Sequence, residues 1–223
     1  MAKSKEEIKD LIGSTGMVPV FYHADFEVCK NIIQACFSGG VRVFEYTNRG
    51  PEALAVFKNL VEFVDKNLPE LVLGIGSIVD AKSAEEFILA GAKFIVSPIL
   101  NPAVAEVCEK HNIPWSPGCG TVTEIYNAQQ LGADVVKVFP ASQVGGPGFI
   151  KAVKGPMPWS TLMPTGGVKP ERENIESWFK AGAFCVGIGS ALFLKKADGT
   201  FDYEKIEALT SETIQTIKTI KSA

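Results

Sequence analysis

The chain has few histidines and arginines, the residues typical of many metal-binding and nucleic-acid-binding proteins. Of its 223 residues, only two are histidine (His23 and His111) and only three are arginine. It has no run rich in lysine and arginine, and its net charge is -3, so nucleic acid is not an expected partner. Because the two histidines are far apart in the sequence, we expect no multi-histidine metal site, and we expect neither a metal nor another cofactor.

Long apolar stretches and paired cysteines are also missing. No apolar stretch reaches the roughly 18 residues needed to cross a bilayer. The first ten residues, MAKSKEEIKD, are rich in charge and contain no apolar segment. We therefore expect no membrane partner and no secretory signal. The five cysteines form no C-x-x-C pair and lie mostly in apolar segments. That usage favours free thiols in a cytoplasmic protein.

What the chain does contain is enough apolar sequence for a full core. Hydrophobic residues make up 46% and charged residues 21%, as in globular proteins. No linker, low-complexity segment or shift of composition divides the sequence. We therefore expect one domain over residues 1–223.

A short signature recurs, in which a helix-like segment ends in a small residue pair and a strand-like segment follows at once. The pairs are Gly39-Gly40, Gly91-Ala92, Gly132-Ala133 and Gly182-Ala183. Glycine ends helices because it adopts the left-handed conformation easily. The repeat therefore predicts a series of βα units.

Eight apolar segments, many of them β-branched, are predicted to be strands. They begin near Val18, Val41, Leu71, Lys93, Ile113, Ala133, Thr161 and Phe184. Ser4 and Glu7 have the spacing of a capping box and predict a helix before the first strand. Proline in Asn101-Pro102 and Lys169-Pro170 suits a first helical turn. The pattern favours a (β/α)8 TIM barrel with an additional N-terminal helix over a doubly wound sheet, since the first strand is followed by no dinucleotide fingerprint.

Lys137 is the most informative single residue. It lies inside the apolar segment ADVVKVFP, which reads as a buried strand. Burying an unpaired ammonium is costly, and such a group tends to lose its proton. The neutral amine is a nucleophile for carbonyl carbons, as in Schiff-base enzymes. The alternative is a lysine whose tip reaches solvent at the end of the strand.

The strand VRVFEYTNR carries two further candidates, Glu45 and Arg49. Side chains alternate along a strand, so Glu45 and Arg49 share one face. Glu45 is a carboxylate in an apolar strand, suited either to a functional role or to a buried salt bridge. Arg49 lies just past the strand end, where it could bind a carboxylate through two hydrogen bonds. The alternative for Arg49 is a solvated loop position.

Three predicted strands end in glycine-rich turns: GIGS with Ser77, PTGG, and GIGS with Ser190. Catalytic residues of barrels lie at the carboxyl ends of strands, and the loops after strands seven and eight often bind phosphate through backbone N–H groups. The last two turns therefore predict a phosphate site. The turn with Ser77 is a weaker signal of a functional site.

Taken in order, the motifs GGVRVFEYTNR, GIGS, AKFIVSP, PGCGTVTE, ADVVKVFPA, PTGGV and VGIGSALF resemble the family of 2-keto-3-deoxy-6-phosphogluconate (KDPG) and 4-hydroxy-2-oxoglutarate (KHG) aldolases. The resemblance runs from about Val18 to Phe193. It implies a metal-independent class I aldolase of carbohydrate metabolism in the Entner–Doudoroff route. It also implies a homotrimer that acts on a small 2-keto acid phosphate.

The resemblance also implies a role for each matching residue. Lys137 would form the Schiff base and Glu45 would move protons through a water. Arg49 and Ser77 would contact the keto-acid end of the substrate. The remaining assignments are a pocket lining of Pro98, Phe139 and Thr165 and a phosphate site of Gly166, Gly167, Gly189 and Ser190.

Two positions depart from the family pattern, and they leave the substrate open. Ser77 stands where the family commonly has threonine, and Lys169 follows the second glycine-rich turn. An aldolase for the galactonate epimer is the main alternative. A phosphosugar isomerase or epimerase on the same barrel is a further one, and a catalytically silent phosphate binder is the last.

Overall fold

The computed structural model describes residues 3–222, which form an α/β fold of alternating strands and helices. Residues 1, 2 and 223 of the expected domain lie outside the described range. The helices are α1 (Lys5–Thr15), α2 (Phe26–Ser38), α3 (Ala53–Asn67), α4 (Ala81–Leu89), α5 (Pro102–Lys110), α6 (Val122–Gln130), α7 (Gly146–Lys154), α8 (Arg172–Lys180), the 3-10 helix η1 (Ser190–Leu192) and α9 (Tyr203–Lys221). The strands are β1 (Met17–Phe21), β2 (Val43–Thr47), β3 (Val72–Gly76), β4 (Ile95–Val96), β5 (Trp115–Ser116), β6 (Gly118–Cys119), β7 (Val136–Val138), β8 (Leu162–Pro164) and β9 (Val186–Ile188).

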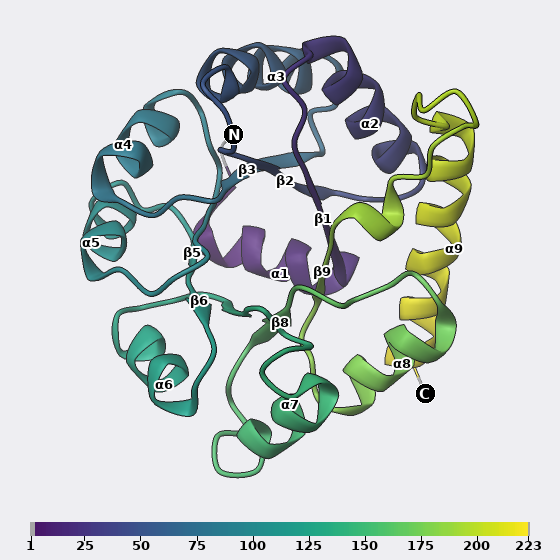
Figure 1. Ribbon diagram of the computed structural model, residues 1–223. Coiled ribbons are helices and arrows are strands. Elements are labelled where there is room, and N and C mark those ends of the chain that lie inside the picture. The colour runs from purple at the N-terminus through teal and green to yellow at the C-terminus, as the bar shows by residue number, and fades with distance from the viewer. Residues whose placement is uncertain (1–2, 223) are drawn as a thin grey trace.

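All pairings between these strands are parallel, and except for β1 with β9, neighbours in the sheet are neighbours in the sequence. One sheet has the order β5-β4-β3-β2-β1-β9 and the other the order β6-β7-β8. The strands curve around a common interior, and α2 to α9 lie around their outside (Figure 1). A doubly wound sheet reverses its strand order near the middle. The observed order, with β1 beside β9, therefore excludes that competitor.

The predicted helix starts are mostly confirmed. The Ser4 hydroxyl accepts from the Glu7 N–H at 3.2 Å, and the Glu7 carboxylate accepts from the Ser4 N–H at 2.6 Å, which completes the capping box of α1. Asn101 caps α5, with Pro102 in its first turn. The prediction for Pro170 is wrong, because α8 begins at Arg172, with Glu171 at the N-cap position. Proline here precedes the helix instead of opening it.

One glycine in each small residue pair before a strand adopts the predicted left-handed conformation. The φ angles are 103° at Gly40, 106° at Gly91, 80° at Gly132 and 101° at Gly182. Each glycine follows a helix and leads directly toward a strand. The repeated signature therefore marks four connections of one design, as expected from the sequence.

The fifth predicted strand differs from the expectation. It consists of two short strands, β5 and β6, with Pro117 between them. Proline has no N–H and cannot donate to a sheet, so the ladder is interrupted at that residue. Its carbonyl still accepts from the Lys137 N–H at 3.0 Å, which joins this segment to β7.

An apolar cluster fills the interior of the curved sheet. It consists of Ile8, Ile12, Val18, Val43, Val72, Phe94, Val96, Val135, Met163 and Cys185. The first two belong to α1, which Figure 1 shows crossing the space between the strands. Because α1 covers this cluster, it buries apolar strand residues that would otherwise face water. A larger cluster packs the outer surface of the strands against the surrounding helices.

Candidate active site

Glu45 and Lys137 lie in the interior because of strand alternation. Val43 on β2 and Val135 before β7 belong to the interior apolar cluster. Side chains two residues apart point to the same face of a strand. The side chains of Glu45 and Lys137 therefore also point inward. They lie next to the apolar cluster, on the side nearer the carboxyl ends of their strands.

The two charged groups meet there, far apart in the sequence but close in space. The distance from Lys137 Nζ to Glu45 Oε1 is 3.7 Å, and the side chains are 7% and 1% exposed. This arrangement confirms that Lys137 is buried and shows that its amine lies beside a carboxyl group. An amine beside a carboxylate can serve both as a nucleophile and as one half of a proton-transfer pair.

The surroundings of Glu45 favour its protonated form. Burial raises the pKa of the carboxyl, while the positive charges of Lys137 and Arg49 oppose that rise. Neither carboxylate oxygen has a hydrogen-bond partner among residues 3–222. Buried carboxylates are normally hydrogen-bonded. A carboxyl with a raised pKa and two unpaired oxygens is suited to exchange protons with a bound molecule.

Gly76 makes room for Glu45, a role that the sequence reading did not assign. β2 pairs with β3, and Thr47 lies opposite Gly76. A Cβ atom at Gly76 would lie 1.8 Å from Glu45 Oε1, far inside contact distance. The absent side chain of Gly76 leaves space for the carboxylate. The signal for this role is a glycine in the strand that pairs with the strand of an inward-facing acid.

Arg49 and Ser77, both expected to contact the keto-acid end of the substrate, lie together at the rim. Arg49 Nε donates to Ser77 Oγ at 3.4 Å, a long hydrogen bond, and Arg49 is exposed. Ser77 has a φ of 62°, in the left-handed region that serine rarely adopts. A rare backbone conformation of this kind is common at ligand sites.

The three predicted lining residues also follow strand ends. The Phe139 ring centroid lies 5.2 Å from Lys137 Nζ. Thr165 is buried, and its hydroxyl has no partner within residues 3–222. Pro98 is half-buried after β4. Of the three, the geometry places Phe139 directly beside the reactive amine.

The predicted phosphate residues form two turns at adjacent strand ends. Gly166 and Gly167 follow β8 with φ angles of 94° and 84°, which other residues rarely adopt. Gly189 and Ser190 follow β9, and Thr165 pairs with Gly187 across the gap between the strands. The bridge brings the two turns side by side, as the phosphate hypothesis requires.

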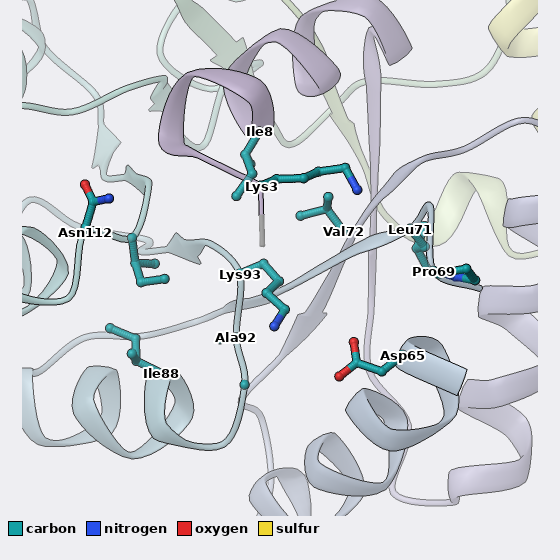
Figure 2. A pocket seen from close by; sticks show the side chains of 12 residues that line it. Lys3, Ile8, Asp65, Pro69, Leu71, Val72, Ile88, Ala92, Lys93 and Asn112 are labelled. Atoms are coloured by element: carbon teal, nitrogen blue, oxygen red, sulfur yellow. The ribbon is translucent and has the colours of Figure 1, made fainter. Parts of the chain in front are cut away.

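A hollow of about 450 Å³ lies elsewhere in the molecule. Figure 2 shows it between α1 and the amino ends of β3 and β4, with Lys3, Lys93 and Asp65 at its edges. It contains none of the predicted site residues. Since barrel chemistry lies at the carboxyl ends of strands, its size does not make it the active site.

Across residues 3–222, no group of three or more His, Cys, Asp or Glu side chains is placed to hold a metal ion. Within the same range, each helix is too short or too polar to span a bilayer.

A buried amine beside a buried carboxyl, at the carboxyl ends of parallel strands, defines an α/β enzyme site suited to carbonyl chemistry. A family model described as KDPG and KHG aldolase matches residues 8–209. The chain therefore belongs to the KDPG and KHG aldolase family, which confirms the resemblance of its motifs.

Relatives and solved structures are similar over nearly their full length. The KHG/KDPG aldolase of Escherichia coli is 29% identical over 98% of this chain and 100% of that protein. A KDPG aldolase from Legionella pneumophila, with pyruvate captured as a covalent carbinolamine intermediate, is 27% identical with a TM-score of 0.81, over 91% and 96% of the two chains. The KDPG aldolase of Zymomonas mobilis with 3-phosphoglycerate is 28% identical with a TM-score of 0.81, over 94% and 96%.

Proposed function

We propose that the protein is a class I aldolase that cleaves KDPG to pyruvate and glyceraldehyde 3-phosphate. The observation that carries this proposal is the buried pair of Lys137 and Glu45, 3.7 Å apart in the interior of the sheet. The covalent pyruvate intermediate in the Legionella relative supports the same chemistry here. Because the Escherichia coli relative is named for both substrates, we also propose cleavage of KHG to pyruvate and glyoxylate.

In this mechanism, the neutral amine of Lys137 attacks the C2 carbonyl of the keto acid. Loss of water gives an iminium, which withdraws electrons from the neighbouring carbons. Glu45 accepts the proton of the C4 hydroxyl through a water, and the C3–C4 bond breaks toward the iminium. The aldehyde leaves and an enamine remains. Glu45 returns the proton to C3, and hydrolysis of the resulting iminium releases pyruvate and restores the lysine.

The other predicted residues bind the two ends of the substrate. Arg49 and Ser77, which contact each other at the rim, bind the carboxylate and carbonyl end. The turns with Gly166, Gly167, Gly189 and Ser190 hold the distal phosphate through backbone groups. Phe139, Thr165 and Pro98 line the space between. The 3-phosphoglycerate in the Zymomonas structure, a ligand with a carboxylate and a phosphate, supports this division.

We also propose that the two sheets belong to one closed (β/α)8 barrel, preceded by the helix α1, in a single domain. Pro117 alone separates β5 from β6, so these two strands can count as the fifth of eight. The bridge from Thr165 to Gly187 supports closure between β8 and β9. The pairing of β1 with β9 supports closure between the first and last strands.

A homotrimer is the proposed assembly. Val79, Ile99 and Val122 follow the ends of β3, β4 and β6, and they are 46%, 47% and 47% exposed. The Asn101 amide donates to the Val79 carbonyl at 2.9 Å, which joins two of the three loops. Exposed aliphatic side chains at several strand ends fit a surface that another subunit covers.

A substrate panel tests the activity. Purified protein should release pyruvate from KDPG faster than from its C4 epimer, the galactonate derivative, and should release pyruvate from KHG as well. Faster cleavage of the epimer would overturn the substrate assignment. Interconversion of phosphosugars without pyruvate release would overturn the aldolase proposal itself.

A further inference from the structure

The hairpin of residues 194–202 has no role in the proposed function. It follows η1 directly, and η1 begins at Ser190 of the proposed phosphate site. Lys195 pairs with Phe201 in antiparallel fashion, and the Asp202 N–H donates to the Leu194 carbonyl at 2.9 Å. This pairing fixes the backbone of Lys195 relative to Phe201.

The hairpin borders a hollow of about 260 Å³ at the carboxyl end of the sheet. Arg49, Ser190 and Lys195 are part of its lining, and no aspartate or glutamate is. The same hollow therefore touches the residue proposed for the keto-acid end and a residue proposed for the phosphate end. Two cations and no carboxylate make it complementary to a molecule with an anionic group at each end.

The ammonium of Lys195 is available to such a molecule. It lies 5.0 Å from the ring centroid of Phe201, which also lines the hollow. Within residues 3–222, no carboxylate lies at ion-pair distance from this ammonium. Phe201 in turn packs on Phe21 of β1, with ring centroids 5.4 Å apart. The aromatic face thus holds the cation beside the hollow without neutralising it.

We propose that Lys195 is a specificity-determining residue that binds the distal phosphate of the substrate together with Ser190. This inference rests on the proposed function, because it takes Arg49 to bind the opposite, keto-acid end. A phosphate monoester carries up to two negative charges and accepts several hydrogen bonds, which a lysine ammonium can donate. The preferred substrate class is therefore 2-keto acids with a phosphate at the far end, in preference to the same acids without phosphate.

The test compares Lys195→Ala with Lys196→Ala. Lys196→Ala removes the same charge from the same hairpin, but Lys196 does not line the hollow. Each variant is assayed with KDPG and with unphosphorylated 2-keto-3-deoxygluconate. We expect Lys195→Ala to raise KM for KDPG about tenfold with kcat nearly unchanged, as for the loss of one charged hydrogen bond. Its kcat/KM for the unphosphorylated acid stays that of the wild type, and Lys195→Arg retains most of the preference.

Equal losses on both substrates, or an equally large loss in Lys196→Ala, would overturn the proposal. Pyruvate trapping with borohydride on the wild type separates this failure from failure of the aldolase function. If the wild type neither traps pyruvate nor cleaves KDPG, the function fails, and binding of inorganic phosphate then decides about Lys195. Phosphorus NMR should show phosphate binding that weakens in Lys195→Ala and persists in Lys196→Ala, and equal binding by both variants would contradict the assignment.

Discussion

A buried carboxyl and a buried amine, those of Glu45 and Lys137, are the centre of the site at the scale of the residue. Removing one member of a buried pair leaves the other without its partner, which commonly costs about 3–5 kcal/mol of stability. Glu45 has no hydrogen bonds within residues 3–222 to offset its burial. A pair so incompletely satisfied is poorly explained by stability and well explained by proton transfer.

Glu45→Gln should still bind pyruvate but turn over slowly. The amide keeps the shape of the side chain but cannot accept a proton, so kcat should fall about 10²–10⁴-fold. Steady-state assay of pyruvate release from KDPG measures this. Glu106→Gln, the same substitution at an exposed position on α5, is the control and should match the wild type. Unchanged kcat in Glu45→Gln would remove Glu45 from the mechanism.

The same residue predicts the acid side of the pH profile. Burial raises the pKa of Glu45, and the proposed mechanism requires its ionised form to accept the C4 hydroxyl proton. Activity is therefore lost as pH falls through that raised pKa, at a pH above the usual glutamate value of about 4.3. A profile of kcat against pH measures the midpoint. A midpoint at or below the ordinary value would contradict the account.

Much of the site could be predicted at this scale, but the residues that make room for the catalytic side chains could not. An acid and a lysine inside apolar strands stand out in the sequence because burying charge is costly. The pairing of β2 with β3, which sets Gly76 beside the Glu45 carboxylate, depends on strand register. Register is a property of two distant segments, and one segment alone does not determine it.

At the scale of the element, strand β3 determines the position of the Glu45 carboxyl group on β2. Gly76→Ala would place a methyl group within 1.8 Å of Glu45 Oε1 in the present geometry, so the carboxylate must move. A displacement of about 1 Å at a catalytic group can cost about 10²-fold in rate. We expect a fall of that order in kcat, measured with KDPG.

Gly148→Ala on α7 is the matched control for Gly76→Ala. A Cβ at Gly148 would meet nothing within 4 Å, so this variant should keep wild-type kcat. Circular dichroism and thermal melting establish that both variants fold. Wild-type activity in a folded Gly76→Ala protein would show that Glu45 does not need the space.

Local signals predicted the elements well where one segment decides the outcome. The capping box at Ser4 and the cap at Asn101 depend on residues within four positions of each other. The split of the fifth strand at Pro117 and the late start of α8 after Pro170 were not predicted. In both cases proline is compatible with several local structures, and its neighbours in space decide among them.

At the scale of the whole molecule, the exposed side chains at Val79, Ile99 and Val122 bear on assembly. Ile99→Asp places a charge in the proposed interface and should dissociate the trimer, because an unpaired charge is costly to bury. Leu89→Asp, at a site 73% exposed on α4, is the control and should remain trimeric. Sedimentation velocity measures both masses, and a wild-type monomer would refute the proposed trimer.

Trapping of pyruvate on the protein tests the central claim most directly. Borohydride reduces an iminium to a stable amine, so incubation with pyruvate and borohydride should add one reduced pyruvyl group to the peptide that contains Lys137. Digestion and mass spectrometry locate the adduct, and Lys137→Ala should show none. Folded wild-type protein without that adduct, beside an aldolase control that is modified, would contradict the Schiff-base account.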